Sequence, residues 1–228
     1  MTPEKSPTQI EFELGEKLLN QRIVEYQATL DPNPDWHTVS GHFTDKDAEL
    51  YERWAMCVHD GETIVELGVE YGRSTAAMLH FLRKYKKFNV KFYSVDIWGP
   101  HPRFAMCYES LRPHIEAFTL ARIREGVVLS TDMQSPVNLV PLDSSIFSLC
   151  FTNTKIAYVF LDTLHTYKEV SKSIDLWWDK VKIGGEMGFH DYAIPRWTGV
   201  VTAIDQKFTY IEPTFRSGVC ISFRKNVA

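Results

Sequence analysis

The sequence predicts an α/β protein built on a mainly parallel, seven-stranded sheet that ends in a C-terminal antiparallel hairpin and follows an N-terminal helical extension. From about residue 60 onward, short apolar runs alternate with segments of helical spacing, as in a parallel sheet covered by helices on both faces. Glycines follow the first apolar run directly, which is typical of a tight strand-to-helix turn. The last two apolar runs are joined by a short link containing Pro213 and Gly218. Because a parallel crossover needs about a dozen residues, these two runs must pair antiparallel.

Two helices are expected before the first strand. The first spans residues 8–30. The segment 31–35, which contains Pro32 and Pro34, ends this helix. The second starts at Thr44, whose side chain can cap the helix. Asp47, at the third helical position, can complete a capping box with it. We therefore divide the chain into a helical extension or lid at residues 1–59 and a main domain at residues 60–228. The expected apolar faces are Ile10, Leu14, Leu18 and Ile23 in the first helix, and Ala48, Tyr51, Ala55 and Val58 in the second.

The main domain is expected to alternate strands with helices. Thr166 and Glu169 form a second capping signal, and the helix that they open is expected to end at Gly184-Gly185. Other helices are expected at 74–85, within 97–124 and from 198. The seven strands are expected at 63–67, 90–95, 126–129, 156–161, 186–189, 208–211 and 219–223.

Composition excludes several classes of function. A formal net charge of -4 over 228 residues argues against non-specific binding of nucleic acid, which needs a basic surface. The four cysteines are far apart and form no C-x-x-C pair, which fits reduced thiols in the cytoplasm. The N-terminus has no signal-peptide core, and no run approaches the roughly 18 apolar residues of a membrane span. We expect a cytoplasmic protein without nucleic-acid or membrane partners.

Polar residues follow each of the first five predicted strands. Because the carboxyl ends of parallel strands meet in one crevice, we expect these residues to form a ligand site. For any single acid, capping of the next helix is the open alternative. The residues are Glu66 with Gly68, Asp96, Asp132, Asp162 with His165, and His190 with Asp191.

The first turn indicates which ligand binds. Gly68 and Gly72 are spaced Gly-x-x-x-Gly, without the G-x-G-x-x-G of dinucleotide sites or the Gly-Lys-Ser/Thr of a phosphate loop. Glu66 is unfavourable beside a phosphate and favourable beside a cation. The pattern Glu66-x-Gly68-x-x-x-Gly72-x-Ser74 resembles the first motif of class I S-adenosyl-L-methionine (SAM) methyltransferases, which have a Rossmann-like fold. The likeness is strongest to the catechol-type and macrocin-type O-methyltransferases.

A second stretch extends the resemblance. Asp162-x-x-His165-x-Tyr167, followed by Gly184-Gly185 and then His190-Asp191-Tyr192, is similar in order and spacing to a broad family of small-molecule methyltransferases. The likeness covers about residues 60–225 and does not extend to the first sixty residues. It implies transfer of a methyl group from SAM to a hydroxyl of a small-molecule acceptor, such as a sugar or natural-product scaffold.

The resemblance also implies roles in cofactor binding. Asp96 would accept the ribose hydroxyls of SAM, and Ile97 or Trp98 would pack on the adenine. Asp132 matches the family position that meets the adenine amino group. The open alternative for both acids is a turn or helix cap. The remaining cofactor-binding residues are Glu66, Gly68, Tyr71, Gly72 and Ser74.

The metal-dependent members place an Asp after the fourth strand and an acidic or amide pair after the fifth. Asp162 and Asp191 match, whereas His190 stands where a carboxylate is expected. These three residues are the expected ligands of Mg²⁺ or Mn²⁺, with Mn²⁺ or Fe²⁺ better suited to an imidazole. Such a metal orients the acceptor hydroxyl and lowers its pKa. His165 is expected to act as the general base beside Asp162, with a purely local hydrogen bond as the alternative.

Several alternatives remain open. A methyltransferase without a metal, a SAM- or nucleotide-binding protein without turnover, an NAD oxidoreductase and an iron-dependent hydroxylase share parts of this pattern. The missing G-x-G-x-x-G argues against NAD. The oligomeric state is open, with a homodimer as the expectation. The candidate acceptor contacts, for which core packing is the alternative at each tryptophan, are Trp98, His101, Arg103, Arg196 and Trp197.

Overall fold

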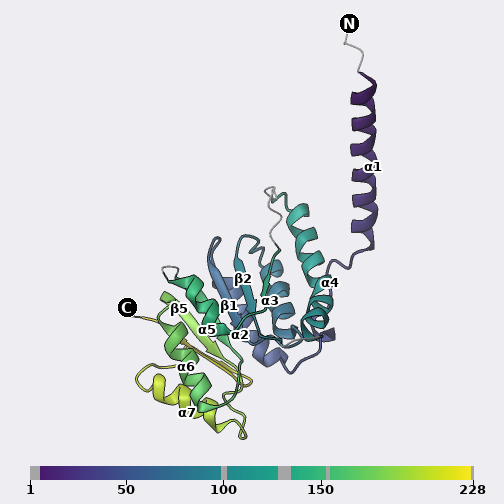
Figure 1. Cartoon of the computed structure of the whole chain (residues 1–228). Helices are drawn as coiled ribbons and strands as arrows, with labels where there is room; N and C mark the ends of the chain where they lie inside the picture. The colour runs from purple at the N-terminus through teal and green to yellow at the C-terminus, as the bar shows by residue number, and fades with distance from the viewer. Residues whose placement is uncertain (1–5, 99–101, 128–134, 153–154, 227–228) are drawn as a thin grey trace.

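The structure, a computed structural model, describes residues 6–98, 102–127, 135–152 and 155–226. In this part of the chain one seven-stranded sheet has the order β3-β2-β1-β4-β5-β7-β6. Strands β1 to β5 are parallel, and β7 pairs antiparallel with both β5 and β6 (Figure 1). The predicted mainly parallel sheet with a C-terminal antiparallel hairpin is thus confirmed. The strands are β1 Thr63–Leu67, β2 Lys91–Val95, β3 Asn138–Val140, β4 Ile156–Leu161, β5 Val181–Phe189, β6 Phe215–Ser217 and β7 Cys220–Arg224.

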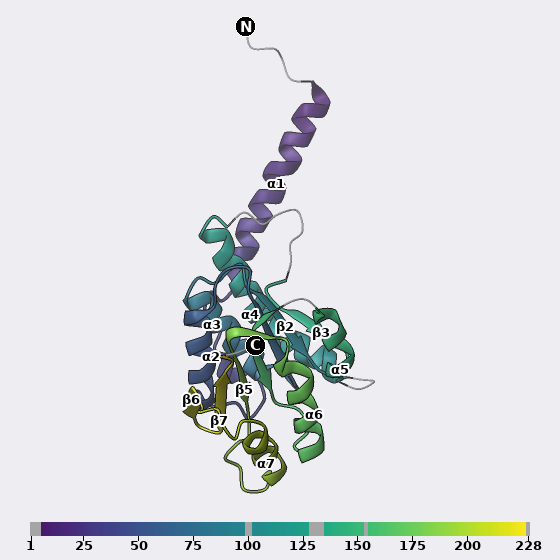
Figure 2. The same cartoon turned by 90° about the vertical axis from the view of Figure 1, so that its left-hand side faces the viewer.

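Helices cover both faces of the sheet, and each face has its own hydrophobic core. Helices α2, α3 and α4 contribute to the core on one face, and α5, α6 and α7 contribute to the core on the other. Figure 2 shows the same arrangement from the side. Within the described residues, no helix combines the length and hydrophobicity needed to cross a membrane. The helices are α1 Pro7–Thr29, η1 Trp36–Thr38, α2 Asp45–Cys57, α3 Arg73–Lys84, α4 Arg103–Arg124, α5 Ser144–Phe147, η2 Ser148–Phe151, α6 Tyr167–Trp178 and α7 Thr198–Lys207.

The two N-terminal helices differ in how they join the body. Helix α1 projects away from it in both views (Figures 1 and 2), and its Leu14 and Leu18 are 56% and 53% exposed. These two residues of the predicted apolar face therefore do not pack against the body of the structure. The side chains of Ile10 and Ile23 lie outside the described part. Helix α2 opens with the predicted capping box and buries its apolar face in the core.

Two predicted strands, the third and the sixth, are misplaced, and the fifth is longer than predicted. The third strand is β3, not residues 126–129, of which 126 and 127 follow α4 in a turn and 128 and 129 lie outside the described residues. The fifth begins at Val181 because α6 already ends at Trp178. Gly184-Gly185, expected to end that helix, lies inside β5, where the register with β4 shifts. The sixth is β6 and not 208–211, because Phe208 follows α7 and is buried in the core.

Candidate active site

A cavity of about 840 Å³ opens at the carboxyl ends of the parallel strands, where the sequence places the ligand site. This volume lies within the range of roughly 300–1,000 Å³ that ligand pockets occupy. The segment at 40–47, which leads into α2, and the β6–β7 turn complete its wall. Of the predicted cofactor, catalytic and metal residues, those that line the cavity are Gly68, Tyr71, Ser74, Asp96, Ile97, Asp162, His165, His190 and Asp191.

The turn after β1 depends on its glycines. Gly68 and Gly72 have φ angles of 89° and 92°, in the left-handed region that favours glycine. A β-carbon on Gly68 would lie 1.7 Å from the carbonyl oxygen of Asp162, so this turn is packed directly against the end of β4. Gly72 is the N-cap of α3, and a β-carbon there would meet Leu111. The glycine spacing therefore places the turn, and with it the start of α3, beside the end of β4.

Asp96, at the end of β2, holds this turn in place. Its Oδ2 accepts hydrogen bonds from the backbone N–H groups of Val69, at 2.8 Å, and Glu70, at 3.0 Å. Its Oδ1 accepts one from the backbone of Trp98 at 2.9 Å. The carboxylate lies in the cavity wall beside the exposed side chain of Ile97. Asp96 thus combines a turn-stabilising role with a position suited to a ligand.

Glu66 lies behind the cavity wall. It is fully buried and accepts hydrogen bonds from the hydroxyls of Tyr51, at 3.0 Å, Ser94, at 2.8 Å, and Thr75. Burial raises the pKa of Glu66, and the surrounding hydroxyls partly oppose that rise. Because Thr75 belongs to α3, Glu66 supports the glycine turn from the side away from the cavity. Its direct contact with a cofactor stays a prediction.

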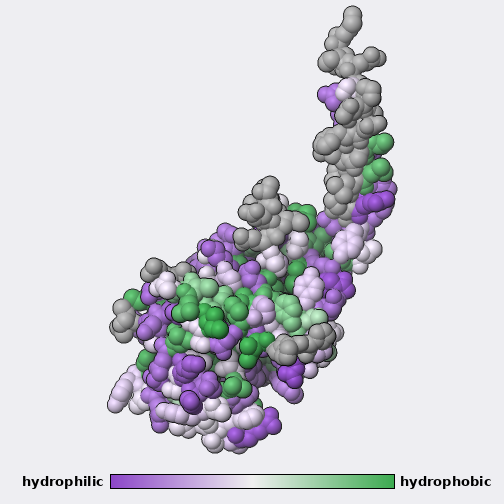
Figure 3. All heavy atoms as spheres, in the orientation of Figure 1, coloured by the Kyte–Doolittle hydropathy of each residue, from purple (hydrophilic) through white to green (hydrophobic). Residues whose placement is uncertain are grey.

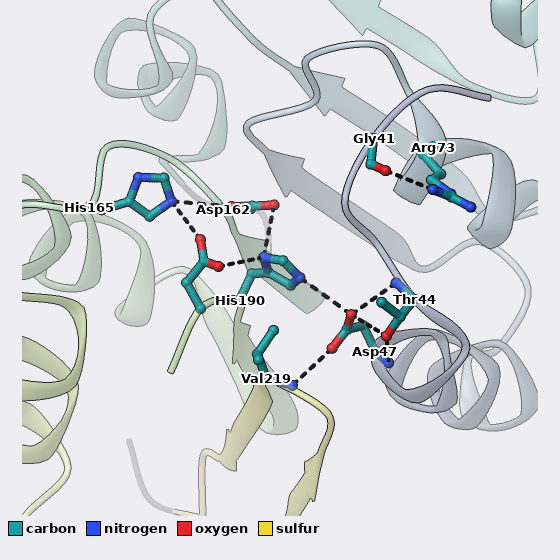
Figure 4. A network of polar contacts seen from close by, with 9 residues as sticks. Gly41, Thr44, Asp47, Arg73, Asp162, His165, His190 and Val219 are labelled. Carbon is teal, nitrogen blue, oxygen red and sulfur yellow. Dashed lines mark hydrogen bonds and ion pairs between the residues drawn. The ribbon is translucent and has the colours of Figure 1, made fainter. Parts of the chain in front are cut away.

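Loops after β4 and β5 bring two aspartates and two histidines together (Figure 4). Nε2 of His165 lies 2.5 Å from Oδ2 of Asp191 and 4.0 Å from Oδ1 of Asp162. Nδ1 of His190 lies 3.4 Å from Oδ2 of Asp162 and 3.3 Å from Oδ1 of Asp191. These four residues, called the acid–histidine cluster below, are the ones that the sequence assigns to catalysis and metal binding.

His190 carries the strongest electrostatic perturbation of the cluster. Burial opposes a charge on its ring, but contacts with the carboxylates of Asp162, Asp191 and Asp47 raise the pKa of His190 to about 12. Burial likewise opposes ionisation of Asp47, yet His190, Thr44 and Val219 lower its pKa to about 2. Three carboxylates thus surround one imidazole at the end of β5.

Two neighbours of the cluster make contacts with it that the sequence does not predict. Asp47, from α2, reaches the far side of the His190 ring, whereas the sequence indicates only its capping role. Trp197 stacks on His165 with ring centroids 4.2 Å apart and an interplanar angle of 15°. The guanidinium of Arg196 lies 4.6 Å from the centre of the Trp197 ring. Four of the predicted acceptor contacts line the cavity: Trp98, Arg103, Arg196 and Trp197.

Within the described residues the acid that follows β3 is Asp143, which the sequence does not single out, and the role of Asp132 stays a prediction. Asp132 and the acceptor candidate His101 lie outside the described residues. Asp143 follows β3, lines the cavity and caps α5 by accepting a hydrogen bond from the backbone of Ser145. Its Asp-Ser-Ser context is a capping signal that could have identified this strand end. Beside it Leu142 is 41% exposed. Figure 3 shows a hydrophobic surface in the region of α5.

The donor set of the cluster fits a divalent cation. One oxygen of Asp162, one of Asp191 and a ring nitrogen of His165 lie within 4.8 Å of one another and face the cavity. His190 adds a second imidazole beside the same two carboxylates. Two carboxylates with an imidazole are a donor set that Mn²⁺ or Fe²⁺ accepts readily.

Comparisons with known proteins identify the family and agree with the fold. The profile of a family described as a methyltransferase domain matches residues 65–192. The fold is similar to that of CalS11, a TDP-rhamnose 3'-O-methyltransferase of calicheamicin biosynthesis, at 16% identity over 97% of this chain and 96% of that one, with a TM-score of 0.62. No curated protein matches the chain.

Two further solved structures are similar. The O-methyltransferase NovP is 17% identical over 82% of this chain and 84% of its own, with a TM-score of 0.53. A SAM-dependent O-methyltransferase from Thermotoga maritima is 14% identical over 86% of this chain and 72% of its own, with a TM-score of 0.55. At these identities the likeness shows a shared fold.

Proposed function

Because the chain belongs to the methyltransferase-domain family, we propose that this class I SAM-dependent methyltransferase methylates a hydroxyl of a small molecule. The observation that carries the proposal is the acid–histidine cluster, which lies in the same cavity as the glycine turn. A proton acceptor and a cation-binding group therefore face the place where a cofactor held by that turn would present its methyl group. The O-methyltransferase activity of the structurally similar proteins supports the choice of a hydroxyl acceptor.

The cavity suits SAM on three counts. Its volume of about 840 Å³ leaves room for an acceptor beside the cofactor. The start of α3 presents backbone N–H groups and a positive helix end toward the turn. Asp96 faces the cavity with a carboxylate that can accept ribose hydroxyls, and the exposed Ile97 and Leu142 offer an apolar surface for a flat base.

The chemistry that we propose needs a proton acceptor at the cluster. Nε2 of His165 would donate its N–H to Asp191, which leaves Nδ1 as the proton acceptor. The acceptor hydroxyl would lose its proton to Nδ1 while its oxygen bonds to the methyl carbon, whose bond to sulfur breaks. S-adenosylhomocysteine and the methyl ether are then the products. Asp191 lies 2.5 Å from Nε2 of His165 and stabilises the imidazolium that forms, and Trp197 fixes the plane of the ring.

Asp162, Asp191 and His190 would hold the divalent metal, as the sequence predicts. When bound there, the metal would orient the acceptor hydroxyl and lower its pKa. The two carboxylates supply the hard oxygen ligands, and His190 supplies the imidazole that favours Mn²⁺ over Mg²⁺. An alternative ligand set uses His165 in place of His190, because its Nε2 lies within 4.8 Å of the same two carboxylates.

For the acceptor we propose a sugar or a natural-product scaffold. Arg196 and Trp197 at the cavity wall offer a guanidinium and an aromatic face, both of which suit a polar ring. A second candidate function is methyl transfer without a metal. The observation that favours it is the 2.5 Å contact between His165 and Asp191, since such a pair can accept a proton without further help.

The decisive experiment is calorimetric titration of SAM into the purified protein, followed by a screen of hydroxylated acceptors for S-adenosylhomocysteine. Micromolar SAM binding and product with at least one acceptor are expected. If SAM binds but no acceptor yields product, the protein is a SAM-binding protein without turnover. If SAM does not bind with or without Mn²⁺, the proposal is wrong.

A further inference from the structure

Asp47 lies on helix α2, outside the residues that match the family profile, yet it contacts the cluster. Its side chain is 2% exposed, and its Oδ2 lies 3.6 Å from Nε2 of His190. That nitrogen is buried and has no hydrogen-bond partner within 3.5 Å among the described residues. The carboxylate is therefore the nearest charged group on this side of the ring.

The other ring nitrogen of His190 faces the proposed metal ligands. Nδ1 lies 3.4 Å from an oxygen of Asp162 and 3.3 Å from an oxygen of Asp191. The imidazole thus separates one carboxylate on its Nε2 side from two on its Nδ1 side (Figure 4). Metal-binding histidines have this arrangement, in which the nitrogen away from the metal donates its N–H to a carboxylate.

The Asp47 carboxylate is fixed from two directions. Oδ2 accepts hydrogen bonds from the backbone N–H and the hydroxyl of Thr44, at 2.9 and 2.6 Å. Oδ1 accepts one from the backbone N–H of Val219 in the β6–β7 turn, at 2.9 Å. A β-carbon on Gly218 would come within 2.4 Å of Oδ1, so the turn packs closely around it. Neither end of the carboxylate can leave His190 without breaking a contact.

We propose that Asp47 is a positioning residue that holds the Nε2 proton of His190 and so directs Nδ1 at the metal site. This inference rests on the metal-binding part of the proposed function. It makes α2 a functional part of the site, since the carboxylate that sets the tautomer comes from that helix.

Cys220 is the other group that could set the orientation of the ring. Its thiol lies within 4.8 Å of both Asp47 and His190 and is buried. Burial raises the pKa of Cys220 well above its usual value, which keeps the thiol neutral. A neutral thiol is a weak acceptor, whereas an ionised carboxylate forms the stronger, charge-assisted hydrogen bond. The positioning role therefore goes to Asp47.

The test measures Mn²⁺ binding to the full chain by calorimetry, without SAM or acceptor. Asp47→Asn is expected to weaken Mn²⁺ binding by about 10- to 100-fold, the usual effect of losing such a carboxylate. Asp45→Asn is the matched control, because it removes an exposed acid from the same helix turn without touching His190. The control is expected to bind Mn²⁺ like the wild type.

A second measurement does not depend on any variant. In wild-type protein loaded with diamagnetic Zn²⁺, the ring ¹⁵N shifts of His190 should show a protonated Nε2 and a metal-bound Nδ1. A metal-bound Nε2 would overturn the inference, as would equal Mn²⁺ affinity in folded Asp47→Asn and wild type. Wild-type protein that binds SAM but no metal would remove the metal site and this inference together, while methyl transfer itself would stand.

Discussion

The carbonyl oxygen of Asp162 occupies the space into which a β-carbon on Gly68 would project, at a separation of 1.7 Å. The glycine turn after β1, which lines the cavity, is thus in backbone contact with the end of β4, which carries the Asp162 carboxylate. A change in the turn would therefore move both halves of the site.

Gly68→Ala is expected to push the turn away from the end of β4, because the added β-carbon would overlap the carbonyl oxygen of Asp162. We therefore expect SAM binding to weaken at least tenfold. Gly61→Ala is the matched control, because Gly61 has a similar φ of 82° but no atom within 4 Å of its added β-carbon. The control is expected to lose only about 1–2 kcal/mol of unfolding free energy, from the left-handed backbone strain, and should bind SAM like the wild type. Calorimetric SAM titration and urea unfolding of both variants measure the difference. Equal SAM affinity in Gly68→Ala and wild type would contradict the close packing.

Asp96→Ala is expected to weaken SAM binding by at least tenfold. The variant loses a carboxylate that faces the cavity and also the acceptor for the N–H groups of Val69 and Glu70. Hydrogen bonds to charged groups contribute about 1.5–3 kcal/mol, and about 1.4 kcal/mol is a factor of ten in affinity. Asp175→Ala, which removes an exposed acid from α6, serves as the control. Unchanged SAM affinity in Asp96→Ala would place the ribose elsewhere.

Variants of the two histidines should separate base from metal ligand. His165→Gln is expected to lower kcat by about 10²–10⁴ while leaving Mn²⁺ affinity nearly unchanged, because it removes the proton acceptor. His190→Gln is expected to lower Mn²⁺ affinity instead. Calorimetry with Mn²⁺ alone and single-turnover rates make the comparison. If His165→Gln loses Mn²⁺ binding and His190→Gln keeps it, the ligand set is Asp162, His165 and Asp191.

The pH dependence of stability tests the charge on His190 in metal-free protein. Its pKa is raised from about 6.5 to about 12, so the stabilisation is complete below pH 6.5 and is lost as pH rises toward 12. The unfolding free energy of the wild type should thus fall between pH 7 and 9 relative to His190→Gln, by at most about 1.4 kcal/mol per pH unit. Urea unfolding at several pH values measures this difference. A difference that does not change with pH would mean that the ring is neutral.

The sequence predicts most of the sheet because its central strands are buried on both faces and appear as continuous apolar runs. Strands β1 and β4 are buried at every position. Strands β3 and β6 have three residues each and no fully buried position, so no such run marks them. Phe208, expected in a strand, instead stacks on Phe223 at 4.2 Å in the core.

The site is predictable where the parallel sheet alone brings residues together. Asp162, His165, His190 and Asp191 follow neighbouring strands, so their proximity follows from the strand order. Asp47 could not be placed in this way, because its contact with His190 depends on how α2 packs against the sheet. Locally the sequence indicates a capping residue, and Asp47 fills that role as well.

Truncation distinguishes the two N-terminal helices. A chain without residues 1–30 is expected to keep its cooperative unfolding and SAM affinity, because α1 projects from the body and exposes Leu14 and Leu18. A chain without residues 1–59 is expected not to fold. Circular dichroism during urea unfolding and SAM calorimetry measure both chains.

The chain without residues 1–59 is expected not to fold because α2 supplies partners to a buried carboxylate. Glu186 on β5 is fully buried and accepts hydrogen bonds from Arg53 and Trp54 of α2, and also from Arg224. Removing one partner of a buried charge pair costs about 3–5 kcal/mol, a large part of the stability of an ordinary domain. Trp54 itself is fully buried, so its loss also opens the core. If residues 60–228 folded alone and bound SAM, α2 would be dispensable for the fold and for SAM binding.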